Sequence, residues 1–249
     1  MRKTVPILIV AVSALAVVIA IAAFALFRAA HAAPEFYERA LAEDPAVYAK
    51  ASDEFLQQAL ALASDVEHRD RWQIVFSERQ INGWLAVDVP HNLPEVIPPE
   101  VNEPRVQILP EELTVACRLK TEQIDAVVSL SANIFASGPN EVAIRIRGAH
   151  VGSLRAPLAQ VLEPLSRALE GLNLQTVWRQ QEGDPVLVIK LGAASDDNRH
   201  GAQLDTIELG NGELLIAGSR GGRAPEPVVQ DDEEPAAVSA SATKTKLQR

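Results

Sequence analysis

Few side chains in this sequence are spaced so that they could do chemistry together, and the main cluster is Asp196, Asp197 and His200. Carboxylate and imidazole groups are common ligands of divalent cations. The cluster falls in the stretch Ser-Asp-Asp-Asn-Arg-His, however, whose composition is typical of a polar loop. We interpret it as such a loop, and we predict neither a metal site nor a bound cofactor.

The sequence also lacks the motifs of common enzyme classes. It contains no GxSxG nucleophile elbow, no HExxH pair and no glycine-rich phosphate loop. The single cysteine, Cys117, alternates with Val115 and Leu119 and should therefore face the apolar side of a strand. A thiol in that position is structural, because a reactive one needs an electropositive and partly exposed setting. We predict that the protein is not an enzyme.

The charge of the chain excludes one class of partner. Asp and Glu number 33 against 23 Lys and Arg, which gives a formal net charge of -10. Nucleic-acid binding needs clustered Lys and Arg that contact phosphates, so we predict no nucleic-acid partner. Hydrophobic residues make up 47% of the chain, which is enough for one domain with a sizeable core.

An uncharged apolar stretch over residues 5–27 indicates a membrane location. As a helix it would measure about 34 Å, enough to cross a hydrocarbon core of about 30 Å. Arg2 and Lys3 precede it and acidic residues dominate beyond residue 28, so the positive-inside rule favours a cytoplasmic N-terminus. We predict a single-pass anchor in the cell membrane, with the main domain extracytoplasmic. A cleaved signal peptide is the alternative, because Ala-His-Ala at 30–32 resembles a cleavage site.

Hydrophobic periodicity predicts the elements that follow. From Tyr48 to Val66, apolar residues recur at spacings of three and four, which predicts a helix that packs on the domain beyond it. Asn211-Gly212 lies between two apolar runs and predicts a hairpin turn. Strands are predicted at 105–109, 113–120, 124–135, 141–148, 174–181, 185–191 and on both sides of that turn within 205–218.

A further strand is predicted to end at Gln73–Phe76, and two helices accompany the strands. Ser77 and Gln80 form the Ser-x-x-Gln pattern of a capping box, so one helix should begin there. Gly83 in this helix lowers helix propensity by about 1 kcal/mol relative to Ala, which is consistent with a close approach of another segment. The second helix, 157–170, has apolar residues on one face and polar residues on the other.

These elements predict an α+β fold, in which a single N-terminal transmembrane helix is followed by a curved antiparallel sheet packed by a short helix and a longer amphipathic helix. The Pro, Ser and Ala content of the last residues, together with their mixed charge, predicts disorder. The predicted parts are a transmembrane anchor at 1–28, a membrane-proximal helical segment at 29–70, an α+β domain at 71–219 and a disordered tail at 220–249.

The segment Gly148–Leu165 resembles the signature of the bacterial YpmS-like family of membrane-anchored proteins, and the stretch FSERQINGWL is similar to an early helix of that family. The resemblance covers about residues 5–190 and implies a shape similar to that of tubular lipid-binding domains. The Pro-rich loop 90–104 and the acidic tail depart from the family pattern. The matching residues are Val151, Gly152, Leu154, Pro157, Val161 and Leu162.

These observations favour a binding protein without catalysis. A helix at 157–170 beside a curved sheet encloses an apolar groove if side chains do not fill the space, and only a core if they do. We predict an apolar ligand, with lipid as the candidate and the membrane as a partner through residues 5–27. The alternative is an envelope scaffold or assembly protein that contacts envelope proteins and has no small-molecule ligand. The candidate groove residues are Ile81, Trp84, Leu85, Leu154, Leu158, Val161, Leu162 and Leu165.

Overall fold

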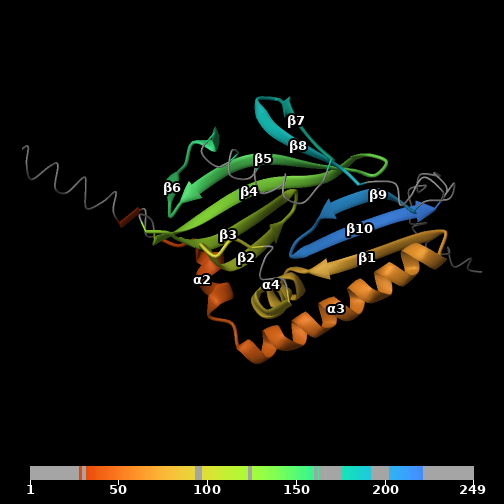
Figure 1. The fold of residues 1–249 in the computed structure, drawn as a ribbon, viewed down its shortest axis with the longest axis horizontal. Coiled ribbons are helices and arrows are strands. Elements are labelled where there is room, and N and C mark those ends of the chain that lie inside the picture. The colour runs from red at the N-terminus through yellow and green to blue at the C-terminus, as the bar shows by residue number, and fades with distance from the viewer. Residues whose placement is uncertain are drawn as a thin grey trace, which may run out of the picture.

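The computed structural model of the chain describes residues 28–29, 32–92, 97–122, 125–159, 162, 166, 175–191 and 202–220. Two antiparallel sheets dominate this part of the chain (Figure 1). The smaller sheet has three strands in the order β1-β10-β9, and Arg71 at one end of the described domain pairs with Ser219 at the other. Its strands are β1 (Arg71–Ser77), β9 (Ala202–Leu209) and β10 (Glu213–Arg220).

The larger sheet has seven strands, six of which follow the order β2-β3-β4-β5-β8-β7, while the short β6 pairs with β5. Neighbours along the sheet are mostly neighbours in sequence, because short turns join them. Its strands are β2 (Val101–Leu109), β3 (Glu112–Lys120), β4 (Asp125–Gly138), β5 (Glu141–Val151), β6 (Leu154–Arg155), β7 (Gln175–Gln181) and β8 (Asp184–Lys190).

Three helices with defined bounds lie in the described part of the chain: α2 (Glu35–Leu41), α3 (Pro45–His68) and α4 (Glu78–Asn92). Helix α3 runs along the smaller sheet, and α4 lies between α3 and the edge of β2 (Figure 1). The apolar stripe of α3 faces the domain as predicted and is buried at its start, with Tyr48 7% and Ala51 3% exposed, while its later members are half-buried. Phe55 of α3 packs on Phe76 of β1, with ring centroids 4.7 Å apart.

Backbone hydrogen bonds join the two sheets at the hairpin between β9 and β10. The amide of Gly212 donates to the carbonyl of Ile108 at 2.9 Å, and the amide of Glu78 donates to the carbonyl of Gly212 at 2.8 Å. Gly212 has φ +77°, a conformation that glycine adopts without strain. The predicted turn at Asn211-Gly212 is therefore confirmed, and it connects β2, the start of α4 and the smaller sheet.

The structure contradicts the predicted fold class. In place of one curved sheet packed by two helices, the described residues form two antiparallel sheets with α3 as their longest helix. The prediction failed because alternation shows which residues form a strand but not which strands pair, and β1 pairs with β10 from the far end of the sequence. None of the helices among the described residues is long and apolar enough to cross a bilayer. The predicted span at 5–27 lies outside those residues, so the predicted membrane location stays a prediction.

Candidate functional site

The start of α4 is built by the predicted capping box. The side-chain oxygen of Gln80 accepts from the Ser77 amide at 2.8 Å, and the Ser77 hydroxyl accepts from the Gln80 amide at 3.2 Å. These two bonds satisfy backbone donors that a helix start leaves free. The Ser77 hydroxyl and the side-chain oxygen of Gln80 are thus accounted for by local structure.

Two side chains of α4 pair with the free edge of β2. Asn82 donates to the carbonyl of Val106 at 2.9 Å and accepts from the amide of the same residue at 2.8 Å. One turn earlier, the carboxylate of Glu78 accepts from the amide of Ile108 at 2.7 Å. Helix α4 therefore closes an edge strand that would otherwise present unpaired backbone groups.

Trp84 lies in a packed interface between helices. Its ring stacks on Phe55 of α3, with centroids 5.2 Å apart and planes at 28°. Its neighbour Gly83 is where α3 comes closest, because a Cβ atom there would stand 2.7 Å from the carbonyl oxygen of Tyr48. The expected close approach at Gly83 is confirmed. Ile81 and Leu85 of the same helix are half-buried.

The structure places the other predicted groove residues in a different part of the fold. Leu154 belongs to β6, which pairs with β5, whereas α4 lies beside β2. Three inter-strand steps separate β2 from β5, or about 14 Å at the usual strand spacing. The two groups therefore do not form one wall. Leu158 and Leu162 are half-buried and helical, while Val161 and Leu165 lie outside the described residues.

A continuous face of the larger sheet, which we call the apolar face, carries no charged side chain. Residues directly opposite in neighbouring strands share a face of the sheet. The strand register therefore places the members of this face on one side of the sheet, from β2 at one edge to β7 at the other. Its members are Val106, Ile108, Leu113, Val115, Cys117, Leu119, Val128, Leu130, Ala132, Ile134, Ile144, Ile146, Ala149, Val151, Leu154, Trp178, Leu187 and Ile189.

Part of the apolar face is left uncovered. Ile146 and Leu187 are 0% and 2% exposed, as in a filled core, but Val115 is 37% exposed. Val115 lies on β3, between β2 and β4, and its cross-strand neighbours Val106 and Leu130 are also apolar. An interior position flanked by apolar side chains is normally buried. The exposure of Val115 shows that the space above it is not filled by the protein.

Ser166, which follows β6 in the sequence, lies on the same side of the sheet. Trp178, on the apolar face of β7, donates from its indole nitrogen to the Ser166 hydroxyl at 3.0 Å. The Ser166 hydroxyl in turn donates to the carbonyl of Leu162 at 2.8 Å, a bond within one helical turn. Ser166 therefore lies over the apolar face, in the segment that the sequence predicted to border a groove.

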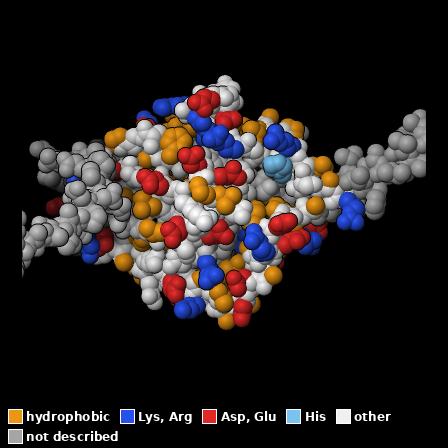
Figure 2. All heavy atoms as spheres, turned by 180° about the vertical axis from the view of Figure 1, so that it is seen from behind, with side chains coloured by type: hydrophobic (Ala, Val, Ile, Leu, Met, Phe, Trp, Pro, Cys, Tyr) orange, Lys and Arg blue, Asp and Glu red, His pale blue; other side chains and the backbone are white. Residues whose placement is uncertain are grey.

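The opposite face of the larger sheet is mixed, because Ala143, Val186 and Val188 form a buried apolar cluster on it and charged side chains pair around them. Arg145 lies 3.1 Å from Glu182, and Lys190 lies 3.6 Å from Glu141. Figure 2 shows side chains of both signs interspersed on the side of the molecule that faces away from the viewer in Figure 1. This mixture lacks the clustered Lys and Arg of a phosphate-binding surface.

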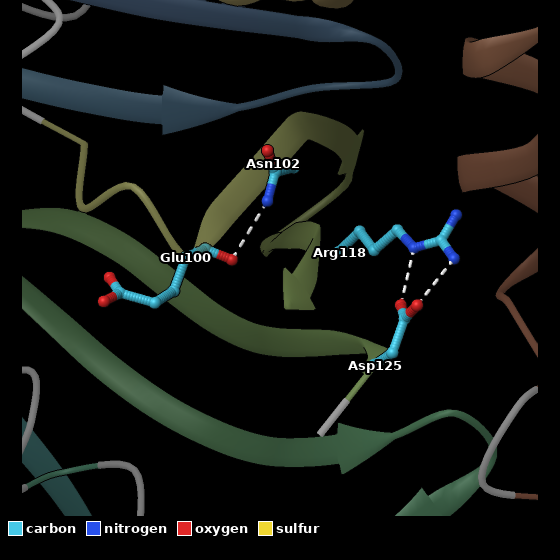
Figure 3. Close-up of polar contacts among 4 residues, drawn as sticks. All are labelled: Glu100, Asn102, Arg118 and Asp125. Carbon is cyan, nitrogen blue, oxygen red and sulfur yellow. Dashed lines mark hydrogen bonds and ion pairs between the residues drawn. The ribbon is translucent and has the colours of Figure 1, made fainter. Parts of the chain in front are cut away.

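Arg118 and Asp125 form a bidentate ion pair where β3 and β4 end, at 2.7 and 3.0 Å (Figure 3). The hydrogen bonds and charge of Asp125 raise the pKa of Arg118. Beside them, Asn102 donates to the carbonyl of Glu100 at 3.1 Å. A cavity of about 280 Å³ opens next to Arg118, but this guanidinium is already paired. The pair holds the strand ends together and offers no free charge to a ligand.

The residues considered as metal ligands or as a nucleophile in the sequence are Asp196, Asp197, His200 and Cys117. Asp196, Asp197 and His200 lie outside the described residues, and no group of three or more His, Cys, Asp or Glu within those residues could hold a metal ion. The absence of metal and cofactor stays a prediction. Burial raises the pKa of the Cys117 thiol to about 11, so the thiol is protonated at neutral pH and a poor nucleophile.

Comparisons with known protein families, curated proteins and solved structures found no match to this chain. The resemblance to the YpmS-like family therefore stays a prediction. The apolar face was not recognised as a candidate site from the sequence, although alternation in β3 and β5 marks one apolar side of each strand. A signal was present at Val115 and Cys117, but the sequence does not show whether such a face is covered.

Proposed function

We propose that the domain binds an apolar ligand of the acyl-chain type on the apolar face, without catalysis. The observation that carries the proposal is the exposure of Val115 on an interior strand within an uncharged face. Exposed apolar surface that polar residues surround is typical of ligand or partner sites. An acyl chain would remove this surface from water, at about 25 cal/mol for each Å² buried.

The position of Ser166 gives the apolar face one raised border. The bond between Trp178 and Ser166 brings Ser166 over the β7 side of the sheet, while Val115 lies toward the β2 side. A long apolar ligand could thus lie beside Ser166 and across the strands. Most small-molecule sites in proteins are mostly apolar, as this face is.

Lipid extraction tests the proposal. The chain from residue 28 onward is expressed in bacteria, purified without detergent and extracted for mass spectrometry. Fatty acid or phospholipid should copurify with the unsubstituted chain. Val115→Asp should lower the recovered amount several-fold, because a carboxylate on the apolar face must be desolvated by the ligand. The matched control is Val75→Asp on β1, since Val75 is 40% exposed and lies in the other sheet.

The control variant should retain the ligand of the unsubstituted chain. Recovery of no lipid from the unsubstituted chain, or an equal loss in both variants, would contradict the proposal. Thermal unfolding of Val115→Asp shows whether a loss of ligand reflects the site or a loss of fold.

A further inference from the structure

A second recess, separate from the apolar face, has a different chemistry. It is a cleft of about 620 Å³ where α2, α3, the first turn of α4, the end of β2 and the β9–β10 turn meet. Phe36, Tyr48 and Leu109 form apolar parts of its wall, and charged side chains border it on the helices. Its volume is within the range of small-molecule sites in proteins, which is about 300–1,000 Å³.

The carboxylates of the cleft already have partners. Glu78 accepts from the amide of Ile108 at 2.7 Å, and Glu43 accepts from the amide of Asp44 at 3.3 Å. Glu54 lies 3.7 Å from the ammonium group of Lys50. An incoming cation would have to compete with these contacts.

The positive groups of the cleft lack partners. Arg39 in the last turn of α2 and Arg79 in the first turn of α4 both border the cleft, and neither guanidinium makes a hydrogen bond or ion pair with a described residue. The N-terminus of α4 adds the positive end of a 15-residue helix at the same place. The cleft therefore offers two cationic donors to a ligand.

Gln80 supplies a neutral donor at the base of the cleft. It is 8% exposed and borders the cleft, and its carbonyl oxygen is held by the Ser77 amide in the capping box. That bond orients the side-chain NH₂ of Gln80 the other way, where no described residue accepts from it. This nitrogen is not among the buried atoms that lack a partner, so it is open to solvent in the cleft and can donate to an acceptor of a ligand.

We propose that this cleft binds a singly charged oxyanion with two terminal oxygens, carried by an organic molecule. Two guanidinium groups and an amide NH₂ border one cleft, and these are the donors that bind the paired oxygens of carboxylates and phosphodiesters. The three nearby carboxylates disfavour a second negative charge, so a monoanion is preferred over a phosphate dianion. Phe36 and Tyr48 would contact the organic part. This site goes beyond the apolar ligand of the proposed function and does not depend on it.

Amide NMR on the full chain in an uncharged maltoside detergent tests the site. The probes are sodium dimethyl phosphate and sodium acetate, each compared with sodium chloride at equal ionic strength. Saturable shifts of the Arg79 and Gln80 amides with dimethyl phosphate, acetate or both support the site. A preference for dimethyl phosphate points to a phosphodiester such as a lipid headgroup, and a preference for acetate points to a carboxylate.

Arginine variants separate a specific site from a general charge effect. Arg39→Gln and Arg79→Gln should each weaken probe binding by about fivefold or more, because each removes a charge-assisted donor. Arg71→Gln removes an exposed arginine of β1 that does not border the cleft, and it should leave binding unchanged. A response no larger than that to chloride, or an equal loss in Arg71→Gln, would overturn the proposal. The variants alter exposed side chains, and their unshifted core amides confirm the fold.

Discussion

Gly83 lies where helices α3 and α4 come closest. A Cβ atom at this position would stand 2.7 Å from the carbonyl oxygen of Tyr48 and 2.9 Å from the amide nitrogen of Ser52. Both are backbone atoms of a helix, so the contact is relieved only if the whole of α3 moves. The absence of a side chain here is a packing requirement of the helix pair.

Gly83→Ala should therefore lower the free energy of unfolding. Alanine gains about 1 kcal/mol of helix propensity over glycine, but overpacking a tight interface costs about 1–3 kcal/mol. We expect the overpacking to dominate, since backbone atoms cannot rotate away. Chemical denaturation measures the difference. Gly148→Ala is the control, because its Cβ would meet only the His150 ring at 3.7 Å, and a Gly83 variant as stable as that control would refute the account.

For single residues, the sequence predicted those contacts that depend only on residues nearby in the sequence. Ser77 and Gln80 were predicted as a capping box because that motif depends on spacing alone, and the structure confirms it. Gly83 was recognised as unusual for a helix, but Tyr48 and Ser52 could not be named as its neighbours. Their proximity depends on how α3 and α4 pack, which no local pattern encodes.

At the scale of elements, α4 links the two sheets. Its first turn bonds to the β9–β10 turn through Glu78 and Gly212, and Asn82 pairs with both backbone groups of Val106. An asparagine can do this because its amide carries a donor and an acceptor side by side, like a neighbouring strand. The helix thereby protects the edge of β2 from pairing with another chain.

Asn82→Ala should destabilise the domain by about 2–5 kcal/mol, because it leaves the buried amide and carbonyl of Val106 without partners. Asn92→Ala is the matched control in the same helix, since Asn92 is exposed and bonds only to Asp88, and it should change stability by less than about 0.5 kcal/mol. Urea denaturation of both variants measures the effect. Equal stabilities would show that the paired amide does not hold α4 on β2.

The element predictions were correct where periodicity and turns are local. The strands of the larger sheet and the turn at Asn211-Gly212 follow the predicted ranges closely. Helix α4, however, continues through Pro90, and β2 begins at Val101. The Pro-rich loop predicted at 90–104 is therefore shorter at both ends. Proline at position 90 removes one backbone hydrogen bond of the helix, and the sequence pattern does not show the tertiary contacts, such as the burial of Val89, that offset this cost.

For the whole molecule, the decisive information is which strands pair and what covers each face. Cross-strand pairing of β3, β4, β5 and β8 gathers alternate apolar residues from separate segments into one uncharged face. The alternation was visible in the sequence, but the partial exposure of Val115 could not be, because it depends on the segments above the sheet. Of the predicted groove residues, Leu154 shares this face and Trp84 does not.

The three tryptophans of the chain lie in different parts of the fold. Trp178 lies on the apolar face, Trp84 stacks between α3 and α4, and Trp72 lies in the smaller sheet beside Gly218. A ligand on the apolar face should therefore approach Trp178 and leave the other two indoles unaffected. Trp178→Phe removes one hydrogen bond, to Ser166, worth about 0.5–1.5 kcal/mol, which should leave the fold intact.

Quenching of tryptophan fluorescence by a brominated fatty acid tests the central claim most directly, because bromine quenches only indoles that lie close to the bound chain. We predict saturable quenching of the chain from residue 28 onward, nearly abolished in Trp178→Phe and retained in Trp84→Phe. Quenching that persists in Trp178→Phe and disappears in Trp84→Phe, or no saturable quenching in the unsubstituted chain, would contradict a ligand on the apolar face.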